Sequence, residues 1–190
     1  MSGPTPQAVV IGASAGAVQA LSAILPRLPA DYPVPVLIVV HVPDGPSGLT
    51  ALFASKSAMA LREPEDKEPI VPGTAYLAPP GYHMLVEADR SIALSTDEPV
   101  LFSRPSIDVL FETAADSYGA GLTGIILTGA NEDGARGAAA VHKAGGTVLV
   151  EDPATAYAAA MPTAALMRCP AAAPMSLDGI ADHLLNLGTS

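Results

Sequence analysis

Three side chains of the types used in acyl transfer follow apolar runs of the sequence. Ser14 lies in Gly12-Ala13-Ser14-Ala15-Gly16, directly after the run Ala8 to Ile11 and before a helical pattern. His41 ends the run Val36 to Val40, and Asn131-Glu132-Asp133 follows the run Leu122 to Leu127. A serine hydroxyl needs a base to take its proton and an acid to orient that base. A hydroxyl, an imidazole and a carboxylate at strand ends therefore predict acyl transfer to water, with the acid in the Asn131 to Asp133 cluster.

The backbone around these side chains suits the same chemistry. Glycines on both sides of Ser14 permit a tight turn and the close approach of a substrate. The amide of Ala15 near the helix start, and those of the loop at Gly129 and Ala130, are candidate donors to the oxyanion that forms when a serine attacks a carbonyl.

Each residue also has a purely structural interpretation. Ser14 can be a helix cap, His41 a hydrogen-bonded histidine at a strand end, and Asp133 the N-cap of the following helix. A nucleotide-binding glycine turn fits less well, because Ser14 replaces the middle glycine of G-x-G-x-x-G and no lysine follows for a P-loop. His83 follows a Pro-Pro-Gly-Tyr loop, where a structural role is at least as consistent with the sequence.

Apolar runs alternate with helical patterns along most of the chain, which predicts strand-helix-strand units around a mostly parallel sheet in an α/β fold. In such sheets ligands bind outside the carboxyl ends of the strands, where the three candidate side chains are expected. Short runs at Met84 to Val86 and Ile92 to Leu94 predict an antiparallel hairpin at one sheet edge. Ser106 and Ser176 are predicted to cap helices.

Composition limits the function classes. With 190 residues, 49% of them hydrophobic, we expect one domain, residues 8–190, after a flexible N-terminus at residues 1–7. The net charge of -10 argues against nucleic-acid binding. The longest apolar run, Val34 to Val40, is far shorter than the roughly 20 residues of a membrane helix, and no signal peptide is recognisable. The lone Cys169 fits a reducing cytoplasm, and the histidine spacing predicts no metal and no cofactor.

Several blocks resemble the catalytic domain of chemotaxis protein-glutamate methylesterases, the CheB family, between about Val9 and Leu187. The blocks, in order, are Ile11-Gly12-Ala13-Ser14, Val40-His41-Val42-Pro43, Tyr76-Leu77-Ala78-Pro79, His83-Met84, Arg104-Pro105-Ser106-Ile107-Asp108-Val109-Leu110-Phe111, Leu127-Thr128-Gly129, Asp133-Gly134-Ala135 and Met161-Pro162.

The resemblance implies a doubly wound, mostly parallel sheet with helices on both faces, and a catalytic triad of Ser14, His41 and Asp133. It selects Asp133 over Glu132, a choice that spacing leaves open. It implies hydrolysis of glutamate γ-methyl esters on the cytoplasmic helices of chemoreceptors, with methanol as product. Some members of the family also deamidate receptor glutamine. Other signalling proteins are further expected partners.

Two departures from the family pattern bear on activity. Ala15 stands where the family often has a hydroxyl residue, and Ala130 where it often has methionine. Only about seven residues precede the first predicted strand, so we expect a stand-alone form without a receiver domain, the alternative being a fragment of a longer chain. Two rival hypotheses stay open: a catalytically weakened binding scaffold in a signalling complex, and a hydrolase of small esters.

Overall fold

The computed structural model describes residues 7–42 and 45–189, so the predicted flexible N-terminus lies outside the described residues apart from Gln7. The strands are β1 (Ala8–Ala13), β2 (Val36–Val40), β3 (Ala60–Arg62), β4 (Thr74–Leu77), β5 (His83–Val86), β6 (Ile92–Ser95), β7 (Leu122–Ile126), β8 (Thr147–Glu151) and β9 (Ala173–Met175). The helices are α1 (Ala17–Ile24), α2 (Leu49–Lys56), α3 (Ile107–Tyr118), α4 (Ala135–Lys143), α5 (Ala160–Arg168) and α6 (Leu177–Leu187), with 3-10 turns at Leu25–Arg27 and Gly119–Gly121.

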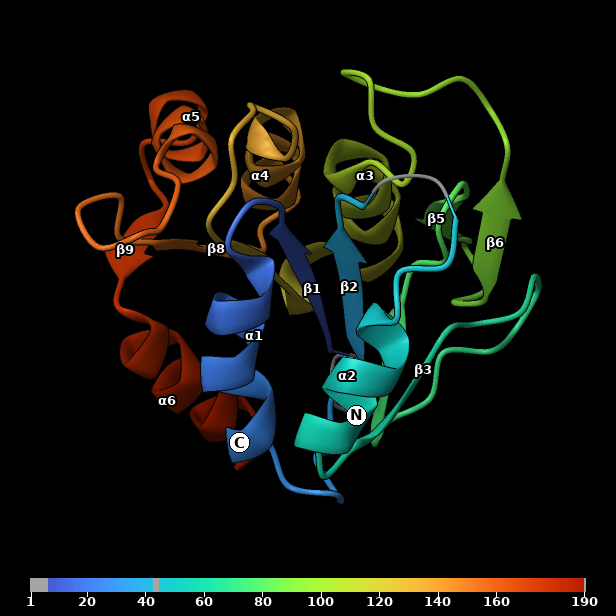
Figure 1. Cartoon of the computed structure of the whole chain (residues 1–190). Coiled ribbons are helices and arrows are strands. Elements are labelled where there is room, and N and C mark those ends of the chain that lie inside the picture. Colours follow the sequence, from blue (N-terminus) through green and yellow to red (C-terminus); the bar gives the residue numbers. More distant parts are fainter. Residues whose placement is uncertain (1–6, 43–44, 190) are drawn as a thin grey trace, which may run out of the picture.

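Seven strands form one parallel sheet in the order β3-β4-β2-β1-β7-β8-β9. The chain builds outward from the central β1 to β2 on one side, and it later returns beside β1 as β7 (Figure 1). The order of the strands therefore reverses at β1, which confirms the doubly wound arrangement. Every residue of β1, β2 and β7 is buried, as the uninterrupted apolar runs predict for strands covered on both faces.

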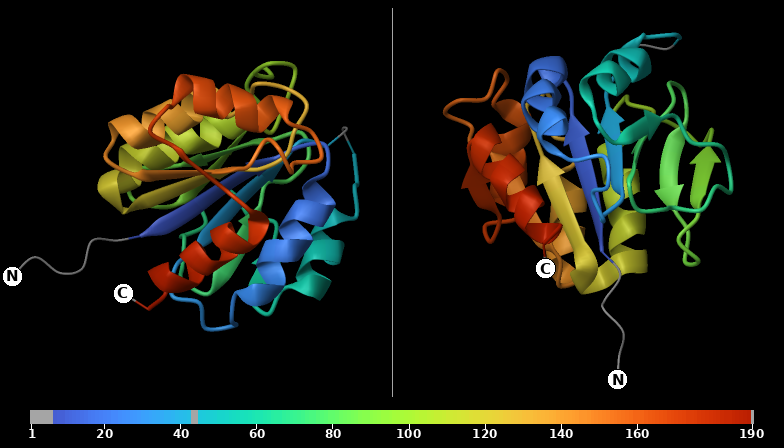
Figure 2. Two further views of the ribbon diagram at one scale, coloured as in Figure 1. Left: turned by 90° about the vertical axis from the view of Figure 1, so that its left-hand side faces the viewer. Right: turned by 90° about the horizontal axis from the view of Figure 1, so that it is seen from below.

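Helices cover both faces of this sheet (Figure 2). On one face α3, α4 and α5 pack over the sheet, and their apolar side chains form one core cluster with alternate residues of the strands. On the other face α1, α2 and α6 form the second cluster. Ser106 and Ser176 cap α3 and α6 as predicted, because their hydroxyls accept the amides of Val109 and Gly179. Among the described helices, none is long and apolar enough to cross a membrane.

The predicted hairpin forms from β5 and β6, whose antiparallel register runs from His83 opposite Ser95 to Val86 opposite Ile92. It is a separate two-stranded sheet beside the main one and has no strand pairing with it. Its buried face joins the core cluster that includes α3. This packing holds the hairpin, and with it His83, next to the first turn of α3.

Candidate active site

The candidate side chains meet at the carboxyl ends of three adjacent strands. Ser14 directly follows β1 and His41 directly follows β2, and these strands pair in register up to Ala13 opposite Val40. The His41 amide continues the ladder by donating to Ala13 O at 3.1 Å. Asp133 lies in the loop between β7 and α4. The position is the topological switch point of the sheet, where open α/β sheets bind ligands.

Ser14 lies on a turn that is held by backbone hydrogen bonds, and its hydroxyl takes no part in them. The helix after it begins with Gly16 as N-cap, at a φ of 87° that favours glycine, and no side chain caps this end. The Ser14 amide donates to Thr128 O at 2.9 Å and the Ser14 carbonyl accepts from Ala17 N, so the backbone is fixed. No other described residue forms a hydrogen bond with the hydroxyl of Ser14. The helix-cap interpretation of Ser14 is therefore wrong.

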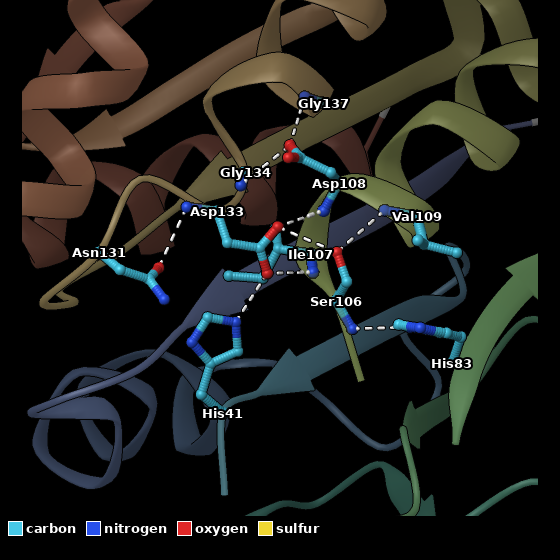
Figure 3. A network of polar contacts seen from close by, with 10 residues as sticks. All are labelled: His41, His83, Ser106, Ile107, Asp108, Val109, Asn131, Asp133, Gly134 and Gly137. Carbon is cyan, nitrogen blue, oxygen red and sulfur yellow. Dashed lines mark hydrogen bonds and ion pairs between the residues drawn. The ribbon is translucent and has the colours of Figure 1, made fainter. Parts of the chain in front are cut away.

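Asp133 is fully buried, and its two carboxylate oxygens accept four hydrogen bonds (Figure 3). Oδ2 accepts from His41 Nε2 at 2.7 Å and from the Ile107 amide at 2.7 Å. Oδ1 accepts from the Ser106 hydroxyl at 3.0 Å and from the Asp108 amide at 2.9 Å. The first turn of α3 thus supplies three of the four donors and fixes the orientation of the carboxylate toward His41.

The balance of these contacts keeps Asp133 ionised. Burial alone would raise its pKa, but the hydrogen bond from His41 and those from the Asp108 and Ile107 amides outweigh burial and hold the pKa below its ordinary value. An ionised carboxylate can only accept hydrogen bonds, so Nε2 of His41 carries the hydrogen and Nδ1 is the nitrogen with the free lone pair. This tautomer is the one in which the imidazole can act as a base at Nδ1.

The His41 ring forms no hydrogen bond to the hydroxyl of Ser14. The structure therefore joins the histidine to the aspartate, whereas the serine hydroxyl has no hydrogen-bond partner among the described residues. In unliganded enzymes such contacts are often long and shorten when substrate binds. A cavity of about 270 Å³ opens beside His41 and is lined by Val42, Pro99, Phe102, Ser103, Arg104 and Pro105.

The predicted oxyanion donors differ in availability. The Gly129 amide donates to Ala158 O at 3.1 Å and its carbonyl accepts from Met161 N at 3.0 Å, so this amide is not free for a substrate. A Cβ at Gly129 would lie 2.5 Å from the Met161 side chain, which explains the glycine. The amides of Ala15 and Ala130 have no acceptor within the described part of the chain.

Thr128 stabilises the turn that carries Ser14, a role that the sequence analysis did not predict. Its hydroxyl donates to Ala15 O at 2.7 Å and accepts the Ala158 amide at 2.8 Å. Its own amide donates to the buried Glu151 carboxylate at 2.8 Å. The only signal for Thr128 was its place in the Leu127-Thr128-Gly129 block.

Glu132 and His83 have positions unlike that of Asp133. The side chain of Glu132 is exposed and forms no hydrogen bond with a described residue. His83 is buried, accepts the Ser106 amide at Nδ1 over 3.1 Å and contacts Glu98 O through Nε2. His83 therefore orients the helix start that holds Asp133, in agreement with a structural role. Among residues 7–42 and 45–189, no cluster of three or more metal-binding side chains occurs.

An open α/β sheet with a serine, a histidine and an aspartate at its switch point is typical of a hydrolase that acts on carbonyl groups. The family model "CheB methylesterase" matches residues 9–184, and the chain belongs to this family. The crystal structure of the Thermotoga maritima CheB methylesterase catalytic domain superposes with a TM-score of 0.89 at 32% identity, covering 97% of this chain and 100% of that one.

Relatives with similar sequences carry one functional name. A Leptospira interrogans protein named protein-glutamate methylesterase/protein-glutamine glutaminase is 43% identical over 182 residues, covering 95% of this chain and 94% of its own length. A protein of the same name from Symbiobacterium thermophilum is 41% identical over 177 residues, or 93% of this chain and 49% of its own length. The chain thus spans nearly the whole of the first relative and about half of the second.

Proposed function

We propose that this protein hydrolyses γ-methyl esters of glutamate on the cytoplasmic helices of chemoreceptors and releases methanol, with Ser14, His41 and Asp133 as the catalytic residues. Family membership and the names of the relatives support the reaction. The observation that carries the residue assignment is the 2.7 Å hydrogen bond between His41 Nε2 and Asp133 Oδ2, at the strand end next to Ser14.

The reaction begins at the hydroxyl of Ser14. As Oγ attacks the ester carbonyl carbon, His41 Nδ1 takes the hydroxyl proton and the ionised Asp133 stabilises the imidazolium that forms. We propose that the amides of Ala15 and Ala130 donate hydrogen bonds to the oxyanion. The bond to methoxide then breaks, methoxide takes the proton from His41, and methanol leaves a glutamyl ester on Ser14.

Water completes the cycle by the same route. His41 removes a proton from water, the hydroxide attacks the acyl carbon, and Ser14 leaves with the proton of His41 to give free glutamate. A glutamine side chain follows the same steps with ammonia as the leaving group. We therefore include deamidation of receptor glutamine in the proposal, as the glutaminase part of the relatives' names supports.

The test is methanol release from receptor membranes that carry labelled methyl esters, measured for the wild type and for Ser14→Ala. The variant should be inactive, because the attacking oxygen is gone. Ser22→Ala is the matched control, since the Ser22 hydroxyl is buried in α1 without a hydrogen-bond partner among the described residues. Turnover by a folded Ser14→Ala protein would remove the nucleophile assignment.

The same assay separates the rival hypotheses. A wild-type protein that binds receptor membranes and releases no methanol would be a scaffold. A protein that hydrolyses p-nitrophenyl acetate and leaves receptor esters intact would be a small-ester hydrolase. Methanol release that depends on Ser14 excludes both.

A further inference from the structure

A second buried carboxylate, Asp108, lies beside Asp133 and has no part in the mechanism above. It occupies the first turn of α3 and is 2% exposed. Its Oδ1 accepts the amides of Gly134 at 2.9 Å and Gly137 at 2.7 Å, and its own amide donates to Asp133 Oδ1 at 2.9 Å (Figure 3). Asp108 is therefore hydrogen-bonded to Asp133 itself and to two residues that follow it, at the start of α4.

Close backbone packing makes this arrangement possible. Gly134 has a φ of 100°, and a Cβ there would lie 2.7 Å from the Ile126 side chain. A Cβ at Gly137 would lie 2.5 Å from Phe111 Cβ. The glycines let the start of α4 approach α3 closely enough for one carboxylate oxygen of Asp108 to accept two amides. The Asp108 side chain is thus fixed by its partners as well as buried by them.

Several charged groups surround Asp108. Asp133 lies in the loop that precedes α4, and Arg136 belongs to α4 itself. Asp108 also lines a cavity of about 590 Å³ together with Glu132 and with Arg168 from α5. On the helix of Asp108, Glu112 pairs with Arg136 over 2.7 Å.

Burial and, to a smaller extent, the charge of Asp133 raise the pKa of Asp108 to about 6, against the opposing effect of the Gly137 amide. At neutral pH the group is therefore mainly ionised. Two adjacent negative charges are then present, and of these two carboxylates Asp133 is the one hydrogen-bonded to His41.

We propose that Asp108 is a positioning residue of the active site: it fixes the loop of Asp133, and its negative charge favours the protonated form of His41 when that ring takes the proton of Ser14. The inference rests on the proposed function. A negative charge near an imidazole stabilises the imidazolium, so the ring becomes a stronger base. Protonation of Asp108 below about pH 6 removes this contribution.

Two substitutions separate the charge of Asp108 from its hydrogen bonds. In Asp108→Asn the single amide oxygen still accepts from Gly134 and Gly137, so only the charge is lost. In Asp108→Ala the two hydrogen bonds from Gly134 and Gly137 are lost as well. Asp116→Asn is the matched control, because it removes an exposed carboxylate two turns further along the same helix.

The first measurement is the pH profile of kcat/KM with p-nitrophenyl acetate. For Asp108→Asn we expect the midpoint of the acidic limb to move down by about one pH unit, the order of magnitude for the loss of one nearby charge. The plateau rate should fall about threefold, because a weaker base removes the serine proton less effectively. Asp108→Ala should lose more activity and also melt at a lower temperature. Asp116→Asn should match the wild type.

The second measurement is the NMR titration of the histidine rings, which requires no activity. The His41 titration midpoint should fall in Asp108→Asn, while those of the remote His142 and His183 stay in place. An unchanged His41 midpoint with an unchanged pH profile would overturn the charge role. Equal losses of melting temperature in both variants would show that Asp108 acts through folding alone. An inactive wild type with the expected NMR shift would contradict the proposed function and leave the influence of Asp108 on His41 intact.

Discussion

Replacing Asp133 by asparagine is the sharpest test of the site, because four donors point at two oxygens in the native protein. An asparagine offers one oxygen and one amide nitrogen. If the nitrogen takes the place of Oδ2, it faces the Ile107 amide, which donates over 2.7 Å in the native protein. If it takes the place of Oδ1, it faces the Asp108 amide, which donates over 2.9 Å. Either orientation leaves one buried backbone amide without an acceptor.

The expected loss of stability follows from this count. An unsatisfied buried amide costs about 1–3 kcal/mol. The free energy of unfolding of Asp133→Asn should therefore fall by about 2 kcal/mol, which urea denaturation measures directly. A nitrogen at the Oδ2 position would also donate to His41 Nε2 and move the ring proton to Nδ1, where it prevents proton removal from Ser14. The same change in a comparable triad lowered turnover by about 10⁴.

Glu132→Gln is the control for this experiment. Glu132 precedes Asp133 in the same loop, and its exposed side chain forms no hydrogen bond with residues 7–42 or 45–189 that could be lost. It should keep nearly the wild-type turnover and stability. Near wild-type turnover in Asp133→Asn would refute the assignment of this carboxylate. Inactivity in Glu132→Gln with activity in Asp133→Asn would transfer the role to Glu132.

Three further predictions concern single residues. The pKa of Asp108 is raised to about 6 in the folded protein from about 4, so its contribution to stability is full below about pH 4 and is lost as the pH rises through about 6. Urea denaturation from pH 4 to 8 should show this decline in the wild type and a flatter profile in Asp108→Asn. Gly129→Ala should lower turnover and melting temperature together, because the new Cβ would lie 2.5 Å from Met161; an unchanged melting temperature would contradict this reasoning. Ala15→Thr should raise kcat by up to about tenfold if the hydroxyl adds one hydrogen bond worth about 0.5–1.5 kcal/mol in the transition state, and an unchanged kcat would exclude that contribution.

The architecture was largely predictable because it depends on long apolar runs. The run Val36 to Val40 is a strand with the same bounds in the structure, and Ser106 and Ser176 cap the helices that their positions predict. The edge strands β3 and β9 were missed. Each has three residues, too few for a periodic pattern, and their pairing depends on neighbours distant in sequence.

The site was predictable in its residue types and less so in its contacts. Strand ends pointed to Ser14 and His41 as candidates, because parallel strands bring their carboxyl ends together. Spacing did not separate Glu132 from Asp133, since both lie in one loop; the amides of α3, over 20 residues earlier, single out Asp133. The same applies to Asp108, whose acceptor role depends on the backbone of α4. Contacts between distant segments leave no trace in local sequence patterns.

The side chains of Asp133 and Ser14 differ in the number of hydrogen bonds that hold them. Asp133 is fixed by four donors, whereas the Ser14 hydroxyl has no hydrogen-bond partner among the described residues. Ser14→Ala should therefore abolish turnover without lowering the free energy of unfolding, while changes at Asp133 lower both. Urea denaturation and ester hydrolysis on the same preparations test this contrast. A loss of more than about 1 kcal/mol in Ser14→Ala would show that the hydroxyl forms a hydrogen bond within the folded protein. The serine hydroxyl would then be held by a hydrogen bond before substrate arrives.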